Sequence, residues 1–134
     1  MIGYLRAVGI RTNLRFMQYA AVRDAGRSAK APLSHQTWGS FSVNDVSAAT
    51  PNFFKFTLDD FARDPEIRDL LEKGDTSIDS KVRADAYGRA LGLIQERAYA
   101  LPMYSLPALY AAPKELVFKT YADEIPRIWE MSYK

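Results

Sequence analysis

The segment from Asp64 to Ala98 reads DPEIRDLLEKGDTSIDSKVRADAYGRALGLIQERA and contains two helix starts, each marked by an aspartate. The first is DPE at 64–66, with an N-cap acid, a proline in the first turn and a second acid near the positive end of the helix dipole. Apolar residues then recur on one face, at Ile67, Leu70 and Leu71. We expect this helix to end at Gly74.

Asp79 caps the second and longest expected helix, which runs from about residue 80 to residue 100. Its apolar residues follow the α-helical period; they are Val82, Ala86, Ala90, Leu93, Ile94 and Ala98. Gly88 and Gly92 interrupt the helix at a cost of about 1 kcal/mol each relative to alanine. A close contact between this helix and a sheet would explain why glycine stands at both positions.

Extended and irregular segments flank the two helices. Pro102 ends the second helix and opens an extended run over 103–112. The final stretch, 113–134, carries aromatic residues that are too numerous for a solvated tail: Phe118, Tyr121, Trp129 and Tyr133. We expect this tail to pack on something, which need not be present in the chain. On the other side, 39–51 is a polar loop, and the apolar patch after it is expected in the core: Phe53, Phe54, Phe56 and Leu58.

The N-terminal residues alternate helix and strand signals. Residues 1–7 are typical of a helix that ends at Gly9. Residues 10–16 alternate apolar and basic or polar side chains, which indicates a half-buried strand. A helix over 18–30 and an extended segment over 33–38 follow. The order helix, strand, helix, strand predicts an α/β fold with a parallel or mixed sheet and a right-handed crossover.

Composition narrows the classes of protein. The chain has 134 residues, of which 48% are hydrophobic, and this is enough for one folded core. It has no cysteine, which excludes disulfides and thiolate chemistry, and no run of about 20 apolar residues that could span a bilayer. The first residues lack the pattern of a signal peptide. Residues 1–38 carry six Lys/Arg against one acid, but these charges are dispersed, so we expect no nucleic-acid partner.

Four pieces of the chain form an ordered pattern. The first is YLRAVGI at 4–10, the second is Trp38 with the polar loop that runs to Pro51, and the last is DEIPR at 123–127. The third is spread over the long helix and its exit: Asp79, Arg83, Tyr87, Ala90, Ile94, Glu96, Ala98, Leu101, Pro102 and Tyr104. In order and spacing the four pieces resemble the C-terminal portion of the solute-binding proteins of peptide/nickel-type ABC importers (family 5).

This resemblance implies a fold and a function. The chain would be a fragment of a type II periplasmic-binding-protein-like fold, with 1–102 in the C-terminal lobe and 103–134 crossing the hinge toward a missing N-terminal lobe. Such proteins capture a peptide or similar small polar solute in the periplasm and deliver it to a permease in the inner membrane. The signal peptide would lie in the missing part. The chain would then be a binding fragment and not an enzyme, and its open edge leaves a dimer of the isolated fragment as an option.

The resemblance places the ligand-binding residues after the tryptophan. Trp38 would stack on a ligand, or it would be a core residue at a strand end. In peptide-binding members an acid soon after the tryptophan holds the ammonium group of the ligand. Asp45 lies farther along than that pattern, and Asn44-Asp45 is also an ordinary turn pair. Ser40, Ser42, Asn44 and Ser47 would hydrogen-bond a polar solute, or they solvate a loop.

Other chemistry has weaker support. His35 is the sole histidine and has no metal-ligand partners at suitable spacing, so we expect a structural role, no metal and no cofactor. The acids Asp59, Asp60 and Asp64 fit capping and surface charge better than a calcium loop, and a small enzyme that uses them would lack a paired base and nucleophile. The main alternative is a free-standing protein-interaction module whose aromatic C-terminal tail is the partner surface.

Overall fold

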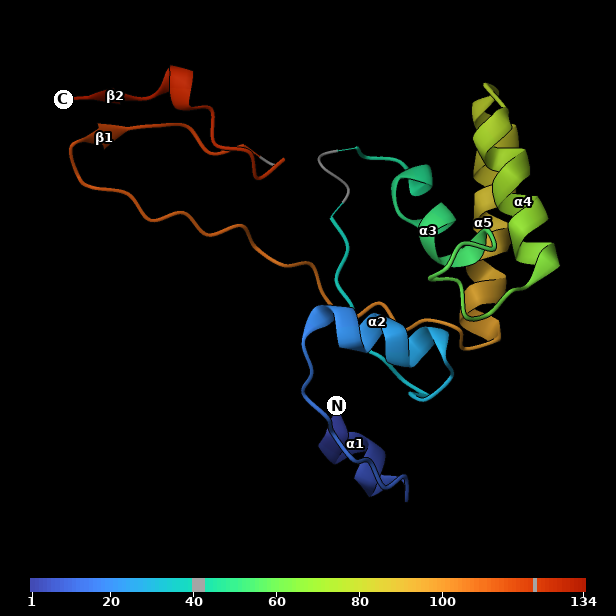
Figure 1. The fold of residues 1–134 in the computed structure, drawn as a ribbon. Coiled ribbons are helices and arrows are strands. Elements are labelled where there is room, and N and C mark those ends of the chain that lie inside the picture. The colour runs from blue at the N-terminus through green and yellow to red at the C-terminus, as the bar shows by residue number, and fades with distance from the viewer. Residues whose placement is uncertain (40–42, 122) are drawn as a thin grey trace. The chain divides into compact units, whose positions relative to one another are not determined.

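The computed structural model describes residues 1–39, 43–121 and 123–134 (Figure 1). Two compact units are distinguished, residues 1–35 and residues 36–134.

Two antiparallel helices form the centre of the second unit. α4 spans Pro65–Thr76, α5 spans Ser80–Glu96, and the two lie side by side (Figure 1). Their facing side chains make one apolar core of Ile67, Leu70, Leu71, Tyr87, Ala90 and Ile94. Val46, Phe54 and Leu93 pack against this core from its edge. The spacing of three and four residues along each helix produces this single buried stripe, as the sequence predicts.

Both predicted helix caps are confirmed. Asp64 Oδ1 accepts from the amides of Glu66 at 3.0 Å and Ile67 at 3.4 Å, and Asp79 Oδ1 accepts from Lys81 at 2.8 Å and Val82 at 3.3 Å. The C-terminal boundaries differ from the prediction. α4 continues through Gly74 to Thr76, and α5 ends at Glu96 rather than near residue 100.

Gly74 lies inside α4 because it faces the ring of Tyr87. A Cβ at this position would lie 2.4 Å from Tyr87 Cε1. The glycine therefore lets the two helices approach rather than ending the first one. Gly88 and Gly92, by contrast, meet nothing within 4 Å, so the predicted close contact with a sheet is not made within the described residues.

Two short helices precede the helical pair. η1 (Val46–Ala48) leads into α3 (Thr50–Phe54), and α3 packs against α4. In the expected apolar patch, Phe54 contacts the core, but Leu58 is 69% exposed, so the prediction of a buried patch is only partly right.

A buried carboxylate organises the loop between α3 and α4. Asp60 is 1% exposed, and it accepts from the amides of Phe56 at 2.9 Å and Arg63 at 2.8 Å. Both donor residues have positive φ, 60° and 47°, a conformation that is unfavourable for bulky side chains. The prediction of surface charge at Asp60 is therefore wrong, because this acid is a buried main-chain acceptor.

The first unit contains α1 (Ile2–Ala7) and α2 (Tyr19–Arg27), which confirms both predicted helices. Gly9 adopts φ +84° after α1, as expected for a helix end. The strand expected over 10–16 is absent, and so is a strand over 33–38. A strand needs a neighbour to complete its hydrogen bonds, and the described residues offer none here. A parallel sheet stays a prediction for a protein in which these segments have partners.

The C-terminal tail is mostly irregular. Residues 103–112 form no strand, whereas β1 (Leu116–Val117) pairs antiparallel with β2 (Ser132–Tyr133). η2 (Ile128–Glu130) directly precedes β2. Figure 1 shows this short hairpin-like pairing at the end of the chain.

Buried residues are confined to one part of the chain. Among the described residues, all buried positions lie between Asp59 and Ile94, and none lies in 1–35 or 103–134. No helix in the described ranges is long and apolar enough to cross a membrane. The folded core is therefore the α3–α5 region.

Candidate functional site

Trp38 lies against the start of the helical region. Its Nε1 donates to the carbonyl of Ala48 at 3.2 Å, and its ring meets Phe53 edge to face, with 5.5 Å between centroids. The side chain is nevertheless 47% exposed. Its polar atom is thus used within the chain, while part of the ring is open for stacking.

Asp45 begins the turn at residues 45–48, which comprises Asp45 and η1. Its Oδ1 accepts from the amide of Ser47 at 2.9 Å and from the Ser47 hydroxyl at 2.6 Å. Its Oδ2 accepts from Arg83 Nη2 at 2.5 Å. The hydrogen bonds from the Ser47 hydroxyl and amide, then that from Arg83, lower the pKa of Asp45 to about 2. The turn interpretation of this acid therefore has a structural basis, and contact with a ligand stays a prediction.

The other predicted contacts are less defined. Asn44 is exposed beside the 45–48 turn. Ser40 and Ser42 lie outside the described residues, so their roles stay predictions. The structure thus brings together Trp38 and Asp45 of the predicted set, through Ala48 and the 45–48 turn.

Arg83 was not among the predicted ligand-binding residues, yet it holds this site together. Its Nη1 donates to the carbonyl of Gly74 at 2.8 Å and more weakly to that of Ser77 at 3.4 Å, at the end of α4. Its Nη2 binds Asp45, and its guanidinium carbon lies 5.0 Å from the centre of the Tyr87 ring. One side chain therefore links α4, α5 and the 45–48 turn.

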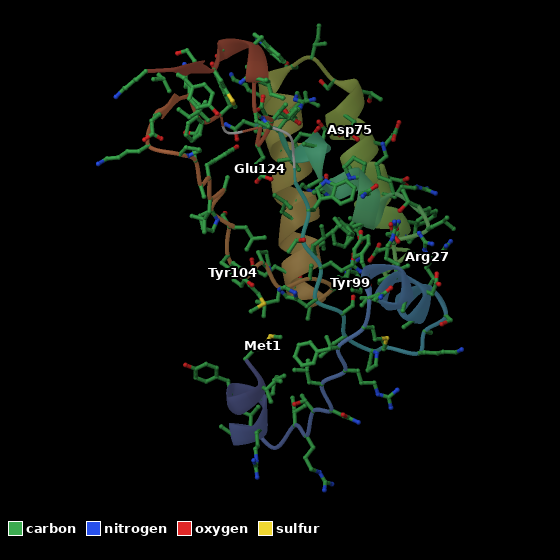
Figure 2. The ribbon with its side chains drawn as sticks, turned by 60° about the vertical axis from the view of Figure 1, so that its left-hand side comes forward. Met1, Arg27, Asp75, Tyr99, Tyr104 and Glu124 are labelled. Atoms are coloured by element: carbon green, nitrogen blue, oxygen red, sulfur yellow. The ribbon has the colours of Figure 1, made fainter. Side chains whose placement is uncertain are left out.

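A second polar group lies beside Arg83. Tyr87 donates its hydroxyl to Asp75 Oδ1 at 2.7 Å, and Lys55 donates to Asp75 Oδ2 at 3.0 Å and also pairs with Glu72. Burial, followed by the hydrogen bond to Asp75, raises the pKa of Tyr87 to about 12. Figure 2 labels Asp75 at this end of the α4–α5 pair. These contacts fix the end of α4 to α3 and α5.

A separate ion-pair cluster closes the opposite end of the helical pair. Asp64, already the cap of α4, also binds Arg97 and accepts from the Tyr99 hydroxyl at 3.2 Å. Arg97 pairs with Glu66 at 2.6 Å. Burial alone would raise the pKa of Asp64, but the hydrogen bonds from Arg97, the Ile67 amide and Tyr99 lower it. Tyr99, labelled in Figure 2, follows α5 at this end.

The small-enzyme alternative would use the carboxylates of Asp59, Asp60 and Asp64. The carboxylates of Asp60 and Asp64 both accept hydrogen bonds from main-chain amides. No group of three or more His, Cys, Asp or Glu side chains that could hold a metal ion occurs in the part of the chain that the structure describes. The contacts of the Asp60 and Asp64 carboxylates therefore support local structure.

In the C-terminal tail, charged side chains gather around the ring of Tyr121. The Arg127 guanidinium lies 3.5 Å from the centre of the Tyr121 ring and donates to Asp123 at 2.9 Å, while Tyr121 also binds Glu130. The tail also has a shallow pocket of about 360 Å³, which is lined by Leu106, Pro107, Ala108, Leu109, Tyr110 and Glu124. Of the predicted ligand-binding residues that the structure describes, none lines this pocket.

Comparisons with models of protein families, with curated proteins and with solved structures gave no match to this chain.

Proposed function

We propose that this chain is the C-terminal portion of an extracytoplasmic solute-binding protein of the peptide/nickel-type ABC importer family. In this proposal the whole protein captures a peptide or similar small polar solute in the periplasm and passes it to an inner-membrane permease. Trp38 and the polar residues after it supply one wall of the ligand site. The sequence pattern from Tyr4 to Arg127 motivates the proposal.

The observation that carries the proposal is the distribution of burial. Large apolar side chains outside the α3–α5 region remain open to solvent, including Phe16 at 90%, Leu109 at 89% and Trp129 at 77% exposed. Exposed apolar surface on this scale is typical of a segment that packs against another surface. A second lobe would cover these side chains and give the unpaired extended segments strand partners.

The ligand site would work by closure of two lobes around the solute. A ligand that contacts both lobes favours the closed arrangement over the open one. Residues 1–102 supply one lobe in this scheme and 103–134 cross the hinge toward the other, so we expect solute binding by this chain alone to be weak.

Native mass spectrometry on the product of the complete reading frame, purified from its source cells, tests the proposal. We expect an extracytoplasmic protein several hundred residues long that carries a small solute, and we expect Trp38→Ala to lose the solute. Trp129→Ala is the matched control because Trp129 lies in the tail, outside the proposed ligand wall. A product without a preceding lobe, or one that never carries a solute, would contradict the proposal.

The first of those outcomes would favour the second candidate function, a free-standing interaction module. The specific observation for that candidate is the exposed aromatic tail, in which Trp129 and Tyr133 are 77% and 73% exposed. It predicts that a partner protein, rather than a small solute, accompanies the purified chain.

A further inference from the structure

The hydrogen bonds of the Arg83 side chain go to residues outside its own helix, α5. Its carbonyl acceptors, Gly74 and Ser77, lie at and just beyond the last turn of α4, where main-chain oxygens lack partners within the helix. Its Nη2 reaches Asp45, 38 residues away in the chain. A planar guanidinium presents five donors in a fixed fork, a geometry that a lysine cannot reproduce.

A continuous line of contacts runs from Arg83 to Trp38. Arg83 holds Asp45 Oδ2, and Asp45 Oδ1 caps η1 through the amide and hydroxyl of Ser47. The last residue of η1, Ala48, offers its carbonyl to the Trp38 indole. Hydrogen bonds and the short η1 segment connect these described residues, so the position of the indole depends on the turn, and the turn depends on Arg83.

We propose that Arg83 is a positioning residue for Trp38 and that it acts through Asp45. It is the internal counterion of the Asp45 carboxylate, and this pairing supports the local architecture of the turn whether or not the acid also contacts a ligand. The link between this arrangement and solute binding rests on the proposed function, whereas the line of contacts itself does not.

The side chains on both ends of the Arg83–Asp45 pair are partly exposed, at 24% and 36%. Exposed ion pairs contribute little to global stability, so loss of this one should act mainly on the local position of the turn. This separates a positioning role from a merely structural one. The signal to follow is the accessibility of Trp38 and not the melting temperature.

Acrylamide quenching of Trp38 fluorescence tests the proposal in the full chain. Trp129→Phe makes Trp38 the sole tryptophan, because the sequence has two. In that background we compare Asp45→Asn, Arg83→Met, the double variant and, as a matched control, Arg89→Met on the same helix. Methionine keeps most of the apolar stem of arginine while it removes the guanidinium.

We expect Asp45→Asn and Arg83→Met each to raise the quenching constant about twofold, since Trp38 is 47% exposed when the line of contacts is intact. The double variant should give no more than either single change, because both break the same connection. Arg89→Met should leave quenching unchanged. Asp45→Asn removes none of the contacts between α4 and α5, so it remains informative if Arg83→Met lowers the helix content seen by circular dichroism.

Quenching in Asp45→Asn that equals that of the parent would overturn the proposal, as would effects of the two changes that simply add. The measurement uses no solute. Its failure would therefore remove the positioning role and leave the proposed function untouched, and failure of the solute experiment would leave this result standing.

Discussion

Asp64 and Asp79 cap their helices with the same hydrogen bonds but differ in their surroundings. Asp79 is exposed, and the contacts described for its carboxylate go to the first turn of α5. Asp64 is 9% exposed and also binds Arg97 and Tyr99. The same residue type therefore performs one task at the start of α5 and two at the start of α4.

Replacing each cap with alanine should reveal this difference. We expect Asp79→Ala to lower the free energy of unfolding by about 1 kcal/mol, the typical value for loss of an N-cap. Asp64→Ala should lower it by about 2 kcal/mol, the upper end of the N-cap range, because Tyr99 and Arg97 also lose their acceptor. Urea denaturation followed by circular dichroism at neutral pH measures both, and equal losses would contradict the second role of Asp64.

Acid should destabilise the fold through carboxylates whose pKa is lowered in the folded state. The pKa of Asp45 is lowered from 3.8 to about 2, and that of Asp64 is also lowered. An acid whose pKa is lower in the folded state contributes stability above its unfolded pKa, and this contribution is lost as the pH falls through the folded pKa. Stability should therefore fall as the pH drops from about 4 toward 2. Urea midpoints across this range measure the slope, and Asp64→Asn should make it shallower, because Asp64 is the less exposed of the two acids. A slope that Asp64→Asn leaves unchanged would contradict the contribution of Asp64.

At the scale of elements, glycine has opposite roles in the two long helices. Gly74 faces the buried Tyr87 ring, whose hydroxyl is held by Asp75, so the ring cannot easily move away. Gly88 and Gly92 face open space at exposed positions of α5. The intrinsic preference of a helix for alanine is the same at all three positions, so packing decides the sign of each substitution.

Alanine at these positions should therefore move stability in opposite directions. Gly74→Ala should lower the free energy of unfolding by about 2 kcal/mol through overpacking. Gly88→Ala and Gly92→Ala should each raise it by about 0.5–1 kcal/mol. Thermal melts of the three variants test this, and a stabilising Gly74→Ala would show that the α4–α5 contact is looser than described.

Local signals in the sequence predicted the helices well. The caps at Asp64 and Asp79 depend on amides two and three residues away, so the sequence alone contains the necessary information. The strand predicted over 10–16 failed because its pattern describes two faces but does not provide the neighbour that a ladder needs. The pairing of Asp45 with Arg83 was also missed, because its 38-residue separation is set by how α5 packs.

At the scale of the whole molecule, folding is concentrated in one region. The described buried residues lie between Asp59 and Ile94, and many large apolar side chains outside that range are exposed. This distribution agrees with the proposal that a further lobe covers those side chains. Trp38 also lies outside that range, but its hydrogen bond to Ala48 in the 45–48 turn attaches it to the folded region.

Limited proteolysis should reflect this distribution of burial. Trypsin should cut first at basic residues in 1–35 and in the tail, such as Arg11 and Lys119. Cleavage requires local opening, and the described residues of these segments include no buried ones. The first stable product should retain α3, α4 and α5, and mass spectrometry of the digest identifies it. Early cleavage at Arg83 or Arg89 would contradict a folded core in this region.

Hydrogen exchange on residues 103–134 tests the central claim most directly, by comparing this chain alone with the product of the complete reading frame. If the chain is one lobe of a solute-binding protein, these amides exchange rapidly in the isolated chain and become strongly protected when the other lobe is present. If they exchange equally fast in both, no second lobe covers the tail, and the assignment to a two-lobed binding protein is wrong.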